Sequence, residues 1–319
     1  MKRLAIAAAL LGALAGPAQA ENIGITISMF DDNNLTRLRN QMKAHVKDMK
    51  DVKLQFEDAQ MDVGKQLNQV QNFVASGVDA IIVNPVDTDA TMAMTKAAED
   101  AGIPLVYVNH EPVNLKKLPE TQAYVGSDEK ESGTLQTQEV CRLLKEKGKD
   151  KDGAKVVVMM GELQAHAARV RTQDIKDVIA RPECSFMKIV ESQTALWMRT
   201  PATDLMTNWL SAGVEFDAVI SNNDEMALGA VQAMKAGGMD MDDVIVAGID
   251  GTSDALAAMK QGDIDVTVFQ NTEGQADGSI DAALNLARGK KVESINYIPF
   301  ELVTMDKVAA YQARYQQKK

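Results

Sequence analysis

The sequence is poor in cysteine, histidine and aromatic residues. Among 319 residues there are two cysteines, Cys141 and Cys184, and three histidines, and aromatic residues make up 4%. A single cysteine pair can staple one part of a chain but cannot build a disulfide framework, and an oxidising compartment would allow it to form. We predict this bond, although spacing alone does not show that the two residues meet. No histidine has a second histidine or cysteine at ligand spacing, so we expect no metal site.

Recognisable catalytic motifs are also missing. The chain contains no GxSxG, no GxxxxGK[ST] and no HExxH, and neither cysteine has a histidine nearby. The segment "VAGIDGTSDAL" lacks the GxGxxG turn that binds a dinucleotide phosphate. We therefore predict neither an enzyme nor a bound cofactor.

Basic charge is in deficit. The 34 basic and 45 acidic residues give a net charge of −11, or −13 once Lys2 and Arg3 are removed with the leader described next. Such a balance argues against nucleic acid and against anionic membrane surfaces as partners. It does not exclude a neutral ligand.

The one long apolar run lies at the N-terminus, in "MKRLAIAAALLGALAGPAQA". Two basic residues, a short apolar stretch and a final Ala-Gln-Ala are typical of a secretory signal peptide, and the stretch is too short for a membrane anchor. We predict cleavage after Ala20, a mature chain that begins at Glu21, and a periplasmic location. The alternative is a retained N-terminal helix.

From residue 22 onward, short apolar runs alternate with longer amphipathic segments. The predicted strands are Ile23–Ser28, Val52–Glu57, Ala80–Val83, Leu105–Val108, Lys155–Met160, Met187–Glu191, Ala218–Ser221, Val244–Ala247 and Val266–Phe269. The predicted helices include Leu35–Met49, Val63–Ala75, Thr91–Ala101, Gly133–Lys145, Ala202–Leu210, Glu225–Ala236 and Gly274–Arg288. This alternation predicts an α/β fold with parallel sheets covered on both faces. A Pro- and Gly-containing break at 111–133 indicates a crossover between two lobes.

Polar side chains recur where the predicted strands end. Ligands of open parallel sheets bind at this edge, because loops and helix N-termini converge there. The candidate ligand-binding residues are Phe30, Asp32, Asn34, Asn109, His110, Arg171, Trp197, Asn223, Asp250 and Gln270. Amides, carboxylates and a guanidinium suit hydroxyl groups, and an aromatic ring suits the C–H face of a sugar. The pattern favours a polyol.

Each candidate also has a structural explanation. Asp87, Asn222 or Asp250 can cap a helix, Phe30 and Trp197 can belong to the core, and Arg171 can be a solvated surface residue. In "SNNDEMALGAV", the spacing of Asn222 and Glu225 fits a capping box, which would leave Asn223 free to face a ligand. We predict that division of roles.

Six segments together carry a family resemblance: "IGITISMFDDNN", "QVQNFVASGVDAIIVNPVDTDA", "IPLVYVNHEP", "AYVGSDEKESG", "VISNNDEMALGAV" and "VAGIDGTSDAL". In this combination and order the chain resembles the type I sugar-binding proteins of bacterial ATP-binding-cassette importers. The resemblance implies two lobes joined by crossovers near 126–128, 270–272 and 303–305. The first lobe would comprise 21–127 with 272–302, and the second 128–271 with 303–319. It also implies sugar contacts from Asp32, Asn109, Arg171, Trp197, Asn223, Asp250 and Gln270.

Departures from the glucose/galactose receptor of that family bear on the ligand. Asn34 stands where that receptor has a stacking phenylalanine, and His110 replaces a lysine. Ala165 and Ala167 replace a histidine and an aspartate, and "GKDKDGAK" lacks the oxygen ligands of its calcium loop. The segments "MMGELQAHAARVRTQDIKDVI" and "QTALWMRTPATDLMTNWLSAG" look more like the branch associated with inositol and rhizopine-type cyclitols.

The resemblance implies a monomeric periplasmic receptor that closes on a small neutral polyol, best myo-inositol or a related cyclitol, and delivers it to a membrane permease of an ABC importer. Alternatives are a receptor for another aldose or for a non-sugar ligand, and a secreted sugar-modifying enzyme. A transcriptional repressor shares the fold but would need a helix-turn-helix where this chain has its leader.

Overall fold

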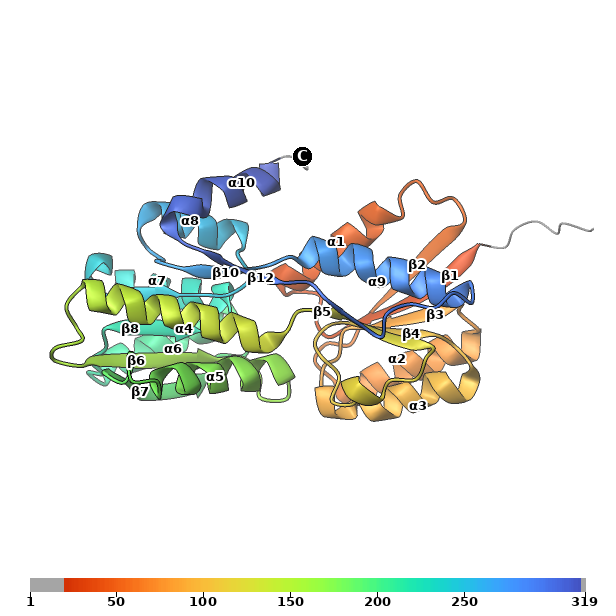
Figure 1. Cartoon of the computed structure of the whole chain (residues 1–319), viewed down its shortest axis with the longest axis horizontal. Coiled ribbons are helices and arrows are strands. Elements are labelled where there is room, and N and C mark those ends of the chain that lie inside the picture. Colours follow the sequence, from red (N-terminus) through yellow and green to blue (C-terminus); the bar gives the residue numbers. More distant parts are fainter. Residues whose placement is uncertain (1–19, 317–319) are drawn as a thin grey trace, which may run out of the picture.

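The structure is a computed structural model that describes residues 20–316, and it consists of two α/β lobes lying side by side (Figure 1). The predicted leader, apart from Ala20, lies outside the described residues. Among the residues described, no helix combines the length and the apolar character needed to cross a bilayer.

The first lobe is built on a six-stranded parallel sheet in the order β11-β5-β4-β3-β1-β2. Its strands are β1 Glu21–Ile27, β2 Val52–Asp58, β3 Ala80–Val83, β4 Leu105–Asn109, β5 Gln122–Gly126 and β11 Ile295–Tyr297. Helices α1 Asn33–His45 and α9 Thr272–Ala287 cover one face, and α2 Val63–Ser76 and α3 Thr91–Ala101 cover the other (Figure 1). Two short 3-10 helices, η1 Thr88–Ala90 and η2 Leu115–Lys117, complete the lobe.

The second lobe has a four-stranded parallel sheet in the order β7-β6-β8-β9. Its strands are β6 Ala154–Met160, β7 Met187–Thr194, β8 Ala218–Ser221 and β9 Ile245–Ala247, and its helices are α4 Glu129–Glu146, α5 His166–Ile179, α6 Arg199–Ser211, α7 Asp224–Ala236, α8 Ser253–Gln261 and α10 Val308–Gln316. An antiparallel pair, β10 Thr267–Gln270 and β12 Phe300–Val303, lies beside β9. The 3-10 helices η3 Met241–Asp243 and η4 Met305–Lys307 connect elements of this lobe.

Central strands are apolar along their whole length because helices cover both faces of each sheet. All four residues of β3 are buried, and they alternate between two cores. Ile82 packs on the side of α1 and α9, whereas Ile81 and Val83 pack on the side of α2 and α3. This is the arrangement expected of a parallel sheet, and the predicted fold class is confirmed.

The two cysteines meet on one side of the second lobe. Cys141 of α4 is bonded to Cys184, with their Cα atoms 5.7 Å apart, inside the range that a disulfide requires. The predicted disulfide is confirmed.

The chain passes between the lobes three times. It crosses after β5, again between β10 and α9, and finally between β11 and β12 (Figure 1). The third crossing comes earlier than the predicted 303–305, because Phe300 already pairs with Gln270 of β10. Residues 300–302 therefore pair with the second lobe's strand, whereas the resemblance had given them to the first lobe.

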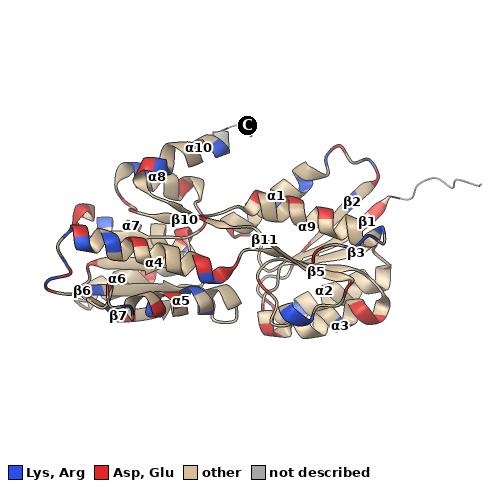
Figure 2. Ribbon diagram, viewed as in Figure 1, with Lys and Arg blue, Asp and Glu red and all other residues tan. Residues whose placement is uncertain are grey.

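Charged residues of both signs are interspersed along the ribbons of both lobes, as on α4 (Figure 2). The excess of acidic residues is thus spread over the molecule rather than gathered in one segment.

Candidate functional site

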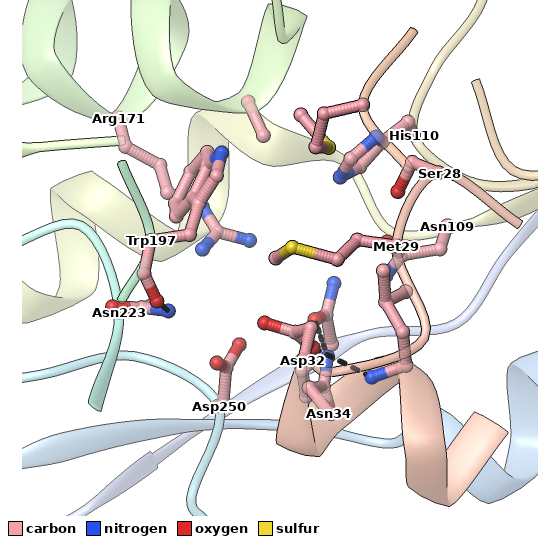
Figure 3. A pocket seen from close by; sticks show the side chains of 14 residues that line it. Ser28, Met29, Asp32, Asn34, Asn109, His110, Arg171, Trp197, Asn223 and Asp250 are labelled. Atoms are coloured by element: carbon pink, nitrogen blue, oxygen red, sulfur yellow. Dashed lines mark hydrogen bonds between the residues drawn. The ribbon is translucent and has the colours of Figure 1, made fainter. Parts of the chain in front are cut away.

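A cavity lies between the lobes, and Figure 3 shows the side chains that line it. Its empty volume is about 500 Å³, open solvent included. Side chains from both lobes line it: Ser28, Met29, Asp32, Asn34, Leu35, Met61, Asn109, His110, Ala167, Arg171, Trp197, Asn223, Asp250 and Gln270. The structure thus brings together nine of the ten candidate residues around one space.

Phe30 is the exception. It is not among the lining residues, and its ring packs under the Arg39 guanidinium, whose central carbon is 3.8 Å from the ring centroid. Met29 and Met61 provide apolar surface from the first lobe instead. The structure therefore gives no support to Phe30 as a cover for a ligand ring.

Asp32 stands at the first-lobe wall and also begins α1. Its Oδ1 accepts a hydrogen bond from the Leu35 backbone N–H at 2.7 Å, which makes it the N-cap of the helix. Burial raises the pKa of Asp32 to about 6, the nearby Glu225 carboxylate adds to the increase, and the backbone N–H opposes it. The carboxyl group is thus held at the cavity at a cost in free energy.

Asn109 and His110 follow β4. Asn109 adopts a left-handed backbone with φ of 66°, and its Nδ2 donates to Gln275 Oε1 at 3.1 Å. His110 Nδ1 lies 2.7 Å from the Pro85 carbonyl oxygen. Because a carbonyl can only accept, Nδ1 carries the proton, and burial lowers the pKa of the ring so that it stays neutral. The free Nε2 is then a hydrogen-bond acceptor.

Arg171 lines the cavity from the second lobe, and an ion pair with Glu129 fixes its guanidinium. Arg171 Nε donates to Glu129 Oε2 at 2.8 Å, and Nη1 donates to the Asn222 carbonyl at 2.7 Å. The side chains of the pair are only 5% and 2% exposed. These two bonds leave the Nη2 protons for a ligand, because a guanidinium has five N–H donors.

Trp197 presents its indole to the cavity from a strained turn (Figure 3). Its φ is 64°, and Leu196 before it has a φ of 59°, both in the left-handed region that non-glycine residues rarely adopt. The indole fits only because position 161 is glycine: a Cβ there would come within 2.1 Å of the ring. The absence of a side chain at Gly161 therefore leaves the space that the Trp197 indole occupies.

The predicted division of roles between Asn222 and Asn223 is wrong. Asn223 is the N-cap of α7, since its Oδ1 accepts from the Met226 N–H at 3.0 Å, and its Nδ2 donates to the Trp197 carbonyl. Asn222 is fully buried, and its Oδ1 accepts from the Gly161 N–H at 3.1 Å. Glu225 forms an ion pair with Arg199 instead of closing a capping box. Asn223 thus caps the helix and lines the cavity at once.

Asp250 follows β9, the strand next to β10, and its backbone φ is 121°. Burial raises the pKa of its carboxyl group well above the ordinary range, the Arg171 guanidinium opposes this increase, and the carboxylates of Asp224 and Asp32 reinforce it. Together with Asp32 it gives the cavity an acceptor from each lobe.

Gln270 ends β10 and is 1% exposed. Its Oε1 accepts from Asn34 Nδ2 at 3.1 Å, and Asn34 Oδ1 accepts from Thr272 Oγ1 at 2.6 Å. Its Nε2 has no hydrogen-bond partner among the described residues. An unpaired buried donor is rare in native proteins and costs about 1–3 kcal/mol.

Glu129, which binds Arg171, is not among the candidates predicted from the sequence, and neither are the lining residues Ser28, Met29, Leu35 and Met61. Glu129 is the first residue of α4, three positions after the end of β5, so the same rule of position after a strand end that pointed to the other candidates applies to it. The sequence pattern does not predict the strand, because it lies in the 111–133 segment, where prolines and glycines interrupt the alternation of apolar runs and helices. A prediction of β5 would have placed Glu129 among the candidates.

Comparisons with known proteins agree with this geometry. A family model described as a periplasmic binding protein domain matches residues 23–291. The chain belongs to the periplasmic binding proteins. The predicted family is confirmed, and a cavity between two lobes is the expected place for a ligand of such a protein.

Three similar proteins show how far the likeness reaches. A Rhizobium meliloti protein named "putative rhizopine-binding protein" is 59% identical over 98% of both chains. A xylitol-binding protein of Mycolicibacterium smegmatis is 31% identical over 96% of this chain and 83% of its own. The structure of an ABC transporter solute-binding protein from Bacillus halodurans, with bound myo-inositol, superposes with a TM-score of 0.86 at 42% identity and covers 94% of this chain and 100% of its own.

Proposed function

We propose that this periplasmic binding protein captures a small neutral polyol, with myo-inositol or a closely related cyclitol as the ligand. The observation that carries the proposal is Gln270 Nε2, a buried donor at the wall of the cavity without a partner among the described residues. A ligand oxygen would satisfy it and recover the desolvation cost of that donor.

The nine lining candidates are the proposed ligand contacts, and their chemistry is mixed. Asp32, Asp250 and the free His110 nitrogen would accept hydrogen bonds, whereas Arg171 and Gln270 would donate them. Trp197 would cover an apolar ring face, and Asn34, Asn109 and Asn223 would complete the shell. A hydroxyl group both donates and accepts, so a ring with a hydroxyl on every carbon can bind both the acceptor and the donor side chains of the cavity.

The choice of a cyclitol over an aldose has two supports. Ala167 lines the cavity at a position where the resembling glucose/galactose receptor has an aspartate, so one hydroxyl-binding group of that receptor is missing here. The similar proteins described above carry names or bound ligands that are cyclitols or an acyclic polyol. Both argue against glucose or galactose as the preferred ligand.

Closure of the two lobes is the proposed mechanism, because groups on both lobes can bind one ring only when the lobes are shut. Among the described residues, the moving bodies would be 21–127 with 272–299, and 128–271 with 300–316. The shut form would then deliver its ligand to the membrane permease of an ABC importer. The proposal includes export by a leader cut after Ala20 and a monomeric mature protein.

The test is a thermal-shift panel followed by calorimetry on the mature protein. A ligand at a hundred times its Kd stabilises the native state by about 2.7 kcal/mol, which gives a clear rise in Tm. We expect the largest rise with myo-inositol or scyllo-inositol, a smaller one with xylitol and ribose, and little with glucose or galactose. NMR spectra of each ligand should stay unchanged on incubation, since no turnover is proposed. A panel without any stabilised compound refutes the proposal.

A variant links the result to the deciding observation. Gln270→Glu keeps an oxygen to accept from Asn34 but replaces the unpaired donor by a second oxygen. We expect at least a tenfold loss of affinity, the value of a hydrogen bond left unmade in a buried site. Unchanged affinity would show that Nε2 does not face the ligand.

A further inference from the structure

Two groups of hydrogen bonds join the lobes outside the cavity lining, and the Arg37 guanidinium of the first lobe also lies over the Tyr315 ring of the second, 4.6 Å from its centroid. The first group joins Asn33 of α1 to Glu225 of α7, and it lies beside Asp32 and Trp197. The second joins Thr88 of η1 to the loop before α5, on the side of Ala167. We call them the Asn33 clasp and the Thr88 clasp.

In the Asn33 clasp, a neutral amide docks on a carboxylate that its own lobe already orients. Asn33 Nδ2 donates to Glu225 Oε1 at 2.8 Å. Arg199 binds both oxygens of that carboxylate, at 2.9 and 3.0 Å, and is itself bound to Asp254 at 3.0 Å. The acceptor therefore loses little freedom when the lobes meet, and the bond to a charged group is of the stronger kind.

In the Thr88 clasp, one hydroxyl is used in both directions. Thr88 Oγ1 donates to the Gln164 carbonyl at 3.3 Å and accepts from Arg169 Nη2 at 3.2 Å. The Thr88 backbone N–H also points at the Gln164 carbonyl, at 3.4 Å. Arg169 Nη1 donates to the Leu163 carbonyl at 2.6 Å and so is fixed on its own lobe. Thr88 is fully buried, whereas Gln164 and Arg169 remain partly open to solvent, so water is excluded from one side of these bonds only.

We infer that the two clasps stabilise the shut form and so raise the affinity of this protein for every ligand on which it closes, by the same factor for each ligand. Asn33 and Thr88 are positioning residues: they touch the opposite lobe, and neither belongs to the cavity lining. The inference rests on the proposed closure mechanism. Because clasp contacts exist only in the shut form, their free energy enters each binding equilibrium by the same amount.

This gives a signature that differs from that of a ligand-contacting residue. Loss of a clasp should raise the Kd for myo-inositol and for xylitol by the same factor and leave their ratio unchanged. The change should lie in the dissociation rate, because opening becomes easier while the encounter of ligand with the open form is unaffected. The Tm of the ligand-free protein should stay within a degree or so of wild type if the open form lacks these contacts.

The variants are Asn33→Ala and Thr88→Val. Each should raise both Kd values roughly three- to tenfold, because the hydrogen bonds it removes are partly open to solvent, which reduces the value even of the bond to the charged Glu225. The clasps share no partner, so the double variant should multiply the two factors. Two matched controls should bind like wild type: Asn40→Ala, an exposed asparagine further along α1, and Thr88→Ser, which keeps the hydroxyl.

The outcomes separate the two levels of the argument. Wild-type protein that binds nothing in the panel refutes the proposed function and the clasps with it. Wild-type protein that binds, with Kd values unchanged in both variants, refutes the clasps alone. A change in the ratio of the two Kd values would also refute the clasps, since it would mean that these residues affect which ligand the protein prefers. Thr88→Ser behaving like Thr88→Val would show that the hydroxyl bonds contribute nothing.

Discussion

We expect the Asp32 carboxylate to lower the stability of the ligand-free protein and to raise its affinity for the ligand, and Asp32→Asn tests both effects. Its pKa is raised from 3.8 to about 6, chiefly by burial, so at pH 7 the folded protein carries a charge that costs free energy. At 1.36 kcal/mol per pKa unit, that increase corresponds to a ceiling of about 3 kcal/mol. Asp32 keeps some exposure at the cavity wall, which screens the charge, so we expect Asp32→Asn to stabilise the ligand-free protein by about 1–2 kcal/mol.

Asparagine can keep the helix cap, since its side-chain oxygen can accept from the Leu35 N–H as the carboxylate does. It cannot keep the charged acceptor that a ligand hydroxyl would use. A hydrogen bond to a charged group is worth about 1.5–3 kcal/mol, so the Kd for myo-inositol should rise between about tenfold and 150-fold. A more stable protein that binds less well is the expected phenotype.

The pH dependence gives the sign of the effect. A carboxyl group with a raised folded-state pKa takes up its proton in the folded state first, so the wild type gains stability as pH falls through about 6 toward 3.8. The stability advantage of Asp32→Asn should therefore be largest above pH 7 and shrink as pH falls through this window. Urea unfolding of the ligand-free proteins at several pH values between 4.5 and 8 (about one unit apart) measures it.

Asp62→Asn is the matched control, because Asp62 is an exposed aspartate that caps α2 through the Lys65 N–H at 2.8 Å. We expect no comparable stabilisation and no change in Kd. Destabilisation of the ligand-free protein by Asp32→Asn, or a stability difference independent of pH, would refute the reasoning from burial. Wild-type affinity in Asp32→Asn would remove Asp32 from the ligand shell.

Three further changes separate binding from folding. Glu129→Ala leaves the buried Arg171 guanidinium without its carboxylate, so we expect a loss of about 3–5 kcal/mol in urea unfolding and weaker binding; an unchanged unfolding curve would show that the pair does not form. Gly161→Ala should displace the Trp197 indole, shift the tryptophan fluorescence and weaken binding tenfold or more, about the cost of losing a stacked ring, and an unaltered spectrum with wild-type Kd would contradict this. Cys141→Ala removes a disulfide between residues 43 positions apart and should lower the free energy of unfolding by about 2–4 kcal/mol. The Kd should be unchanged at temperatures where the variant stays folded. A changed Kd would mean that the disulfide affects the shape of the cavity.

Elements with a strong local pattern could be predicted from the sequence. The run of four apolar residues at β3 and the helix 91–101 occur with the predicted bounds, since a buried parallel strand is apolar throughout and an amphipathic helix is periodic. Strands β5, β11 and β12 were not predicted. β11 is mostly exposed and three residues long, and it is a strand only because β5 lies beside it, which no local pattern encodes.

The candidate site followed from topology more than from residue type. Parallel strands end at one edge, so a single rule about position gathered residues from Asp32 to Gln270 into one set, and nine of the ten line the cavity. Phe30 met the rule but packs against Arg39 instead. The direction of a side chain beyond a strand end depends on loop geometry, and that geometry comes from contacts that the sequence does not show.

Capping and ligand binding are alternative explanations for polar residues at strand ends, and this structure shows that one residue can do both. Asp32 and Asn223 each cap a helix and each line the cavity. In a parallel sheet the strand ends and the following helix N-termini meet at the same edge, so a cap stands beside the ligand by construction. A carboxylate has two oxygens and an amide has an oxygen and a nitrogen, so one atom can cap the helix while the other faces the cavity or binds the Trp197 carbonyl.

Asn223→Ala should therefore lower the stability of the folded protein by about 1 kcal/mol, the value of a helix cap, and should lower the affinity for the ligand as well. Asn223→Ser keeps a hydroxyl oxygen that can cap the helix but not the Nδ2 donor, so it should restore most of the stability and leave affinity low; recovery of both would show that the amide nitrogen has no part in the site.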